Sequence, residues 1–154
     1  VGKARWVGTD ELHLTLRFIG NADERTATRL VELAALRSWS APSIALRGVG
    51  VFGPLERARV LWVGVAPDPA LLALAADLEA IAREAGLAPE ARPFAPHLTL
   101  ARLKAPRAAA LQTYLRKHEA LEIAPFRATE LVLFESRQGP SGVTYHPFHT
   151  FALA

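Results

Sequence analysis

The chain has 154 residues, 51% of them hydrophobic and 21% charged, and it contains neither Cys nor Met. This length suits one domain with its own hydrophobic core. The lack of Cys excludes disulfides, thiol nucleophiles and thiolate metal sites, and no uncharged stretch reaches the ~18 residues of a membrane-spanning helix. The net charge of +3 is only weak support for an anionic ligand. We expect a cytoplasmic protein with no membrane partner.

Hydrophobic periodicity and turn residues predict a mixture of strands and helices. In chain order we expect a strand at Leu12–Ile19, a helix at Asp23–Ser38, strands at Ser43–Phe52 and Arg59–Ala66, a helix at Asp68–Glu84, a strand at His97–Leu103, a helix at Arg107–His118, and strands at Arg127–Ser136 and Val143–Leu153. The Gly-rich and Pro-containing segment 138–142 predicts a hairpin between the last two strands. No low-complexity linker interrupts the series, so we expect a single domain, 1–154.

An internal repeat is the most informative feature of the sequence. The tetrapeptide His-Leu-Thr-Leu occurs at residues 13–16 and again at 97–100, each time before a predicted helix and a further strand. A strand and a long helix also precede the second copy, whereas only 12 residues precede the first. By analogy between the halves, a strand and helix of about 25 residues are expected to be missing at the N-terminus.

Strand geometry gives the repeated tetrapeptide a chemical meaning. Side chains alternate between faces, so His13 shares a face with Thr15, His97 shares one with Thr99, and the leucines face a core. A neutral imidazole can take a proton from water or a hydroxyl, and a protonated one can donate to a leaving oxygen. Threonine hydroxyls can donate hydrogen bonds to phosphate oxygens. The pattern predicts metal-independent phosphodiester chemistry by two histidines.

A metal site is the weaker interpretation of the same residues. Asp10 and Glu11 precede His13, but no carboxylate stands in the equivalent position before His97. Two histidines without a carboxylate pair form a poor ligand set for zinc. We therefore expect no metal and no cofactor.

Three longer segments carry a resemblance to a known family. They are Glu-Leu-His-Leu-Thr-Leu-Arg-Phe-Ile-Gly at 11–20, Arg-Pro-Phe-Ala-Pro-His-Leu-Thr-Leu-Ala-Arg at 92–102, and Leu-Phe-Glu-Ser-Arg from residue 133 with a later Gly142 and Tyr145. With these segments the chain resembles the two-histidine (2H) phosphoesterase superfamily, and within it the 2′-5′ RNA ligases, also called RNA 2′,3′-cyclic phosphodiesterases.

The resemblance implies a fold, an activity and roles for single residues. The implied fold is α+β with two lobes in a pseudo-two-fold repeat, each lobe an antiparallel sheet with helices outside and a groove between. The implied reaction opens RNA 2′,3′-cyclic phosphate ends to a 2′-phosphate, and some members also join 2′-5′ linkages. His13 and His97 would be catalytic. We expect His97 to act as base toward water and His13 as acid toward the 3′ oxygen, and the near-symmetry of the two motifs leaves the reverse assignment open. Thr15 and Thr99 would hold the phosphate.

Two further positions match the family, each five residues beyond a histidine. The resemblance implies that a nucleobase stacks on Phe18 and that Arg102 contacts phosphate. Strict alternation places both side chains on the face opposite the histidines, so either the strands bulge there or the two residues are structural. Arg17 lies on the His13 face by alternation and is a rival for the phosphate contact.

The other histidines and the tryptophans fit structural roles. His118 ends a predicted helix, His146 and His149 should face opposite sides of a strand, and the three tryptophans fit packing positions.

Three functions stay open at this stage. They are a monomeric enzyme acting on RNA with a 2′,3′-cyclic phosphate or a 2′-5′ linkage, a cyclic phosphodiesterase of small nucleotides, and a non-catalytic RNA- or nucleotide-binding module.

Overall fold

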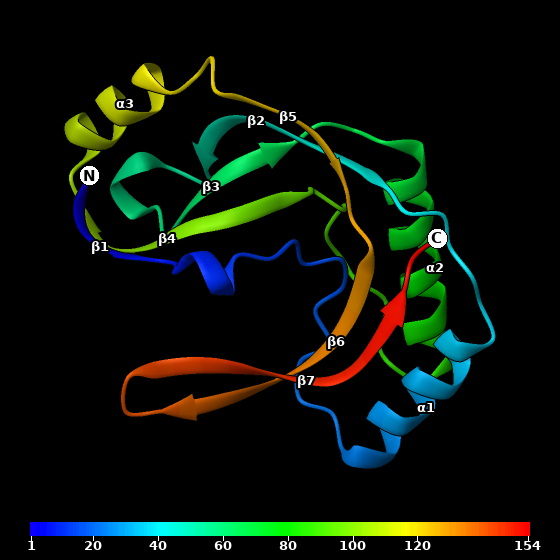
Figure 1. Ribbon diagram of the computed structural model, residues 1–154. Helices are drawn as coiled ribbons and strands as arrows, with labels where there is room; N and C mark the ends of the chain where they lie inside the picture. The colour runs from blue at the N-terminus through cyan, green and yellow to red at the C-terminus, as the bar shows by residue number, and fades with distance from the viewer. The chain divides into compact units, whose positions relative to one another are not determined.

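A computed structural model describes residues 1–154 (Figure 1). Its elements in chain order are β1 (Gly2–Trp6), the short 3₁₀ helix η1 (Thr9–Glu11), α1 (Glu24–Ala35), β2 (Ser43–Val51), the 3₁₀ helix η2 (Leu55–Arg57), β3 (Val60–Val65), α2 (Pro69–Glu84), β4 (His97–Pro106), α3 (Ala108–Lys117), β5 (Glu122–Arg127), β6 (Glu130–Gly139) and β7 (Gly142–Ala152). The predicted α+β class is confirmed. None of the three helices is long and apolar enough to cross a membrane.

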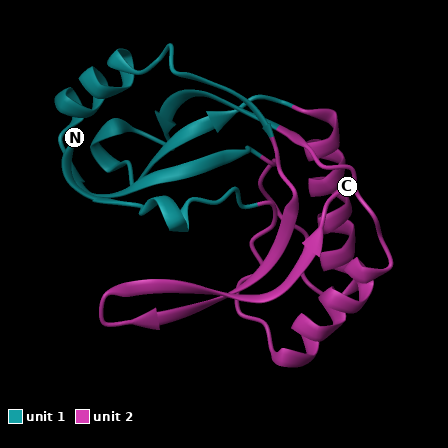
Figure 2. Cartoon of the chain, in the orientation of Figure 1, with its two compact units in different colours: residues 1–15, 44–67, 95–126 teal, residues 16–43, 68–94, 127–154 magenta.

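The chain divides into two compact units that do not follow the halves of the sequence (Figure 2). Unit 1 comprises residues 1–15, 44–67 and 95–126, and unit 2 comprises residues 16–43, 68–94 and 127–154. Each unit combines antiparallel strand pairs with helices. Both histidines of the repeat, and both threonines, belong to unit 1.

Unit 1 is built on a five-stranded sheet with the order β1-β4-β3-β2-β5. In β3 every second residue is buried (Leu61, Val63 and Val65), as expected for a strand with one face on a core. Leu61, Ala101 and Leu103 form a core with Leu111 of α3, and Tyr114 of the same helix packs against it. One face of the sheet therefore contacts α3, and the residues that alternate with these lie on the other face.

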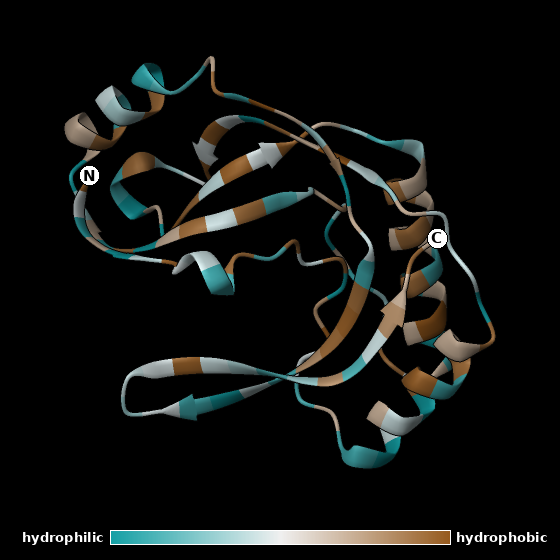
Figure 3. Ribbon diagram, in the orientation of Figure 1, coloured by the Kyte–Doolittle hydropathy of each residue, from teal (hydrophilic) through white to brown (hydrophobic).

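Unit 2 combines α1 and α2 with the antiparallel hairpin β6–β7. Asp23 and Asp68 cap the two helices by accepting hydrogen bonds from backbone N–H groups in the first turn. Hydrophobic residues are concentrated along α2 (Figure 3). The core of this unit contains Leu30, Leu33, Ala34, Trp39, Leu74, Ile81, Ala82 and Leu153.

The secondary structure confirms most of the predicted elements and corrects one near the first motif. Leu12–Ile19 is not a strand, because only Leu14 forms an isolated bridge. Leu16 and Ile19 pack against the core of unit 2, whereas the residues up to Thr15 belong to unit 1. The apolar alternation thus crosses from unit 1 into unit 2 after Thr15. Strands β1 and β5 were not predicted.

Candidate active site

The two His-Leu-Thr-Leu copies are joined in unit 1. An antiparallel bridge connects Leu14 of the first copy to Leu98 of the second. The register about this bridge sets His13 opposite Thr99 and His97 opposite Thr15. Directly opposed residues on one face have Cβ atoms about 4.5–5.5 Å apart. In this antiparallel register each histidine faces the threonine of the other copy, so the two histidines and two threonines lie in one region of unit 1.

Each of the two imidazoles is held by an equivalent hydrogen bond to the backbone. Nδ1 of His13 lies 2.7 Å from the carbonyl oxygen of Glu11, and Nδ1 of His97 lies 2.7 Å from that of Ala95. A carbonyl oxygen only accepts, so each Nδ1 carries a hydrogen and donates it. In both rings Nε2 is then the nitrogen that takes up or releases a proton. This is the arrangement that an acid–base pair requires.

His97 is further held by two aromatic side chains. The Phe52 ring meets His97 edge to face, with centroids 4.9 Å apart, and the Trp62 ring lies 6.4 Å away. Trp62 is paired with Gly50 on the neighbouring strand, where a Cβ would come within 2.3 Å of the indole ring. Gly50 therefore allows the indole to lie across β2. Sequence reasoning missed this cluster, since it indicated only a packing role for Trp62 and none for Phe52.

The two threonine hydroxyls differ in environment. Thr99 is half-buried in β4, opposite Trp62 of β3, whereas Thr15 is exposed. Both can donate a hydrogen bond to a phosphate oxygen, and the donor that is better shielded from water should contribute more to the interaction.

A β-bulge in β4 moves Arg102 to the face of His97. Trp62 pairs with Thr99, but its neighbour Leu61 pairs with Ala101, so Leu100 is an extra residue on β4. The bulge shifts the alternation by one position. Arg102 consequently lies opposite Val60, on the face that carries His97, and its side chain is exposed. The sequence allowed either a bulged strand or a structural role for Arg102, and the structure shows the bulge.

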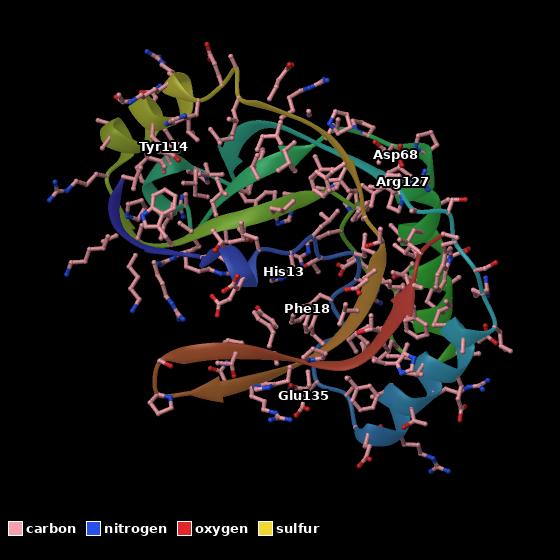
Figure 4. All side chains as sticks on the ribbon, viewed as in Figure 1. His13, Phe18, Asp68, Tyr114, Arg127 and Glu135 are labelled. Carbon is pink, nitrogen blue, oxygen red and sulfur yellow. The ribbon has the colours of Figure 1, made fainter.

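Phe18 and Arg17 both lie in unit 2. The Phe18 side chain is 67% exposed, so it is not a core residue (Figure 4). Arg17 is nearly buried and forms an ion pair with Glu79, and it also donates to the carbonyl oxygens of Phe18 and Ala88. These three contacts occupy the guanidinium within unit 2. Arg17 is therefore not the phosphate ligand that strict alternation suggested.

The remaining histidines lie outside the repeat. His118 is the C-cap of α3 and stacks on Tyr114, in agreement with the predicted helix end. His146 and His149 share one side of β7, because a bulge at Phe148 shifts the alternation, and the expectation of opposite faces was wrong. His146 forms a hydrogen bond with Thr144, and His149 packs on Phe151.

Comparison with known proteins gives consistent matches along most of the chain. The family model of the 2′-5′ RNA ligase superfamily matches residues 4–140. The chain is 37% identical over 139 residues to an RNA 2′,3′-cyclic phosphodiesterase of Aeropyrum pernix, covering 87% of this chain and 79% of that protein. It is 30% identical over 156 residues to an RNA 2′,3′-cyclic phosphodiesterase of Escherichia coli, covering 97% of this chain and 80% of that protein.

Solved structures of similar proteins share the fold. A crystal structure of a Thermus thermophilus protein, TT0787, matches with a TM-score of 0.77 at 27% identity, covering 97% of this chain and 82% of that chain. The E. coli protein LigT, crystallised with 3′-AMP, matches with a TM-score of 0.73 at 30% identity, covering 97% of this chain and 81% of that chain. These matches span both units.

Proposed function

Because the chain belongs to the 2′-5′ RNA ligase superfamily, we propose that it opens the 2′,3′-cyclic phosphate at RNA 3′ ends by paired action of His13 and His97. The chain is an RNA 2′,3′-cyclic phosphodiesterase of the same kind as its relatives. The observation that carries the proposed mechanism is the matching hydrogen bond at each Nδ1, which makes Nε2 of both rings the nitrogen that would exchange a proton.

The proposed reaction uses one proton transfer at each histidine. Nε2 of neutral His97 takes a proton from water as the water oxygen bonds to phosphorus. Protonated His13 gives its Nε2 proton to the 3′ oxygen as the bond between that oxygen and phosphorus breaks. The product is a 2′-phosphate with a free 3′ hydroxyl. A ribose 5′ hydroxyl in the place of water would form a 2′-5′ linkage by the same steps.

Four further side chains complete the proposal. Thr15 and Thr99 would donate hydrogen bonds to the non-bridging oxygens of the phosphate, where negative charge develops. Arg102, on the His97 face, would add a charged donor to a phosphate group. Phe18, with its exposed ring, would stack on the terminal nucleobase, a contact worth about 1–3 kcal/mol.

The proposal extends to the organisation of the protein. We propose that residues 1–154 act as one two-lobed catalytic domain, since the family model spans both units. A monomer is sufficient for the chemistry, because both histidines and both threonines come from one chain. We propose a cytoplasmic location, where RNA substrates occur.

The decisive experiment combines product identity with a metal-free assay. A nucleoside 2′,3′-cyclic phosphate is incubated with the protein in EDTA, and phosphorus NMR distinguishes the 2′-phosphate from the 3′-phosphate. We expect only the 2′-phosphate, no loss in EDTA, and a fall of about 10²–10⁴ in kcat for His97→Ala.

The matched control is His118→Ala, which removes a histidine of unit 1 outside the repeat and should keep full activity. A 3′-phosphate product would show that the 2′ oxygen leaves and not the proposed 3′ oxygen. Loss of turnover in EDTA, or full activity of His97→Ala, would overturn the paired-histidine mechanism.

A further inference from the structure

Strands β1 and β4 present four cationic side chains in two directly opposed pairs. Lys3 pairs with Lys104, and Arg5 pairs with Arg102. All four side chains are exposed or nearly so, and together with Ala4 they line one of the surface hollows of the molecule. We call these four residues the basic ladder.

The basic ladder forms no ion pair within the protein. None of its members takes part in any of the six ion pairs of the structure. Like charges placed directly opposite each other on neighbouring strands destabilise the pairing. The fold therefore keeps an unfavourable interaction that an anionic ligand would relieve, and the ligand must carry several charges to meet four cations.

Protection of a sheet edge does not account for this arrangement. Lysines on an edge strand prevent it from pairing with another chain, and β1 is an edge strand of its sheet. Strand β4, however, lies between β1 and β3, where no edge needs protection. Arg102 and Lys104 on this inner strand require another explanation.

The basic ladder continues from the candidate active site along the same strand. After the bulge at Leu100, Thr99, Arg102 and Lys104 share one face of β4. Side chains two residues apart on a strand are about 7 Å apart. A chain of phosphates with its terminal group at Thr99 can therefore extend over Arg102 and then between Lys3 and Lys104.

We propose that the basic ladder binds the backbone phosphates of single-stranded RNA on the 5′ side of the terminal cyclic phosphate. The protein then acts more efficiently on an RNA end than on a cyclic mononucleotide, which has no such phosphates. This inference rests on the proposed function for the location of the cyclic phosphate, and it gives Lys3, Arg5 and Lys104 a role in substrate selection.

The test compares two substrates on one triple variant, Lys3→Gln with Arg5→Gln and Lys104→Gln. One substrate is adenosine 2′,3′-cyclic phosphate, and the other is a short single-stranded RNA with a 2′,3′-cyclic phosphate end. We expect kcat/KM on the RNA to fall about tenfold or more at low salt through a higher KM. The rate on the mononucleotide should not change. The salt dependence of kcat/KM on RNA should become shallower, by up to about 0.7 in log–log slope for each lost contact.

The matched control is a second triple variant, Arg57→Gln with Arg116→Gln and Lys117→Gln. It removes the same charge from other exposed positions of unit 1 and should leave both rates unchanged. If the control variant loses as much kcat/KM on RNA as the ladder variant does, the effect comes from the net charge of the protein and the basic ladder is overturned. Equal losses on both substrates, or no loss on RNA, would also overturn it.

RNA binding measured by fluorescence anisotropy separates this inference from the proposed function. The probe is a labelled RNA of the same sequence ending in a 2′-phosphate. If the wild-type protein cleaves neither substrate yet binds this RNA more tightly than the ladder variant does, the proposed function fails and the basic ladder stands. If the protein cleaves both substrates and the two proteins bind the RNA equally, the ladder fails and the proposed function stands.

Discussion

The first His-Leu-Thr-Leu copy, residues 13–16, lies in an irregular segment, whereas the second, residues 97–100, begins the ten-residue strand β4. Despite this difference, both histidines donate from Nδ1 to the carbonyl oxygen two residues earlier at 2.7 Å. The orientation of the ring thus depends on the local backbone and on the bridge between Leu14 and Leu98, and not on membership of a strand.

The two copies also differ in the segments that come after them. Beyond Thr15 the chain enters unit 2, where Arg17 is fixed by Glu79. Beyond Thr99 the chain stays in the sheet of unit 1 and carries Arg102 to the exposed face through a bulge. Equivalent hydrogen bonds at the two histidines are therefore combined with different downstream residues: Arg17 is anchored in unit 2, whereas Arg102 is exposed and is our proposed phosphate contact.

The largest expected effect distinguishes the acid from the base in the histidine pair. If His13 is the acid, His13→Ala should lose about 10²–10⁴ in kcat on a ribose cyclic phosphate, because the 3′ oxygen then leaves without a proton. A phosphodiester with a p-nitrophenol leaving group needs no acid, so it should restore most of the rate to His13→Ala relative to wild type. His97→Ala should not be rescued. Rescue of His97→Ala instead would exchange the two roles.

The threonines should show a smaller and unequal effect. Thr99→Val should cost about 10²-fold in kcat, as expected for loss of one donor to developing negative charge, and Thr15→Val should cost about tenfold because its hydroxyl is exposed to water. Steady-state kinetics on the cyclic mononucleotide measure both. Equal losses would mean that bound substrate shields the two hydroxyls alike.

The sequence predicted which residues come together in this region better than it predicted the secondary structure of the region. The repeat identified the two histidines and two threonines, and the structure brings both copies together. The strand predicted at Leu12–Ile19 was wrong because alternation reports only that apolar side chains are buried. It does not say that Leu14 bridges to β4 while Leu16 and Ile19 pack in another unit.

The bulges and the basic ladder were beyond sequence reasoning for a different reason. A single extra residue, Leu100 in β4 or Phe148 in β7, reverses which face all later residues occupy, and no local signal marked it. The pairing of Lys3 with Lys104 depends on β1, a strand too rich in charge to be recognised. The role of Phe52 beside His97 likewise arises from folding alone, since the two are distant in sequence.

A third prediction uses the ring contact between Phe52 and His97. Phe52→Ala removes the edge-to-face contact with His97, an interaction of about 0.5–1.5 kcal/mol, and should lower kcat by up to about tenfold. Because Phe52 acts on the proposed base, the loss should remain with a p-nitrophenol leaving group. Phe126→Ala is the matched control, since the two rings are similarly exposed in unit 1, at 47% and 48%. A loss that disappears with the better leaving group would assign Phe52 to the acid side.

The smallest effect concerns the anchor beyond the first copy. Hydrogen bonds from the Glu90 backbone N–H and from Arg17 hold the pKa of Glu79 below its ordinary value of about 4.5. A lowered pKa in the folded state stabilises the protein above the ordinary value, and this stabilisation is lost as the pH falls through the lowered value. Glu79→Gln should therefore reduce the free energy of unfolding by about 1–2 kcal/mol at pH 7. The gap to wild type should narrow at a pH well below 4.5.

Urea denaturation followed by tryptophan fluorescence measures this gap, because one of the three tryptophans, Trp39, is buried in the core of unit 2 beside α2. Glu84→Gln, an exposed position on the same helix without an ion pair, is the control and should be neutral at both pH values. Turnover of the cyclic mononucleotide by Glu79→Gln should stay at the wild-type level at pH 7, since the variant still folds there. A loss of turnover without a loss of stability would mean that the segment after the first copy serves catalysis directly. The contrast between an anchoring Arg17 and an Arg102 proposed to contact phosphate would then no longer hold.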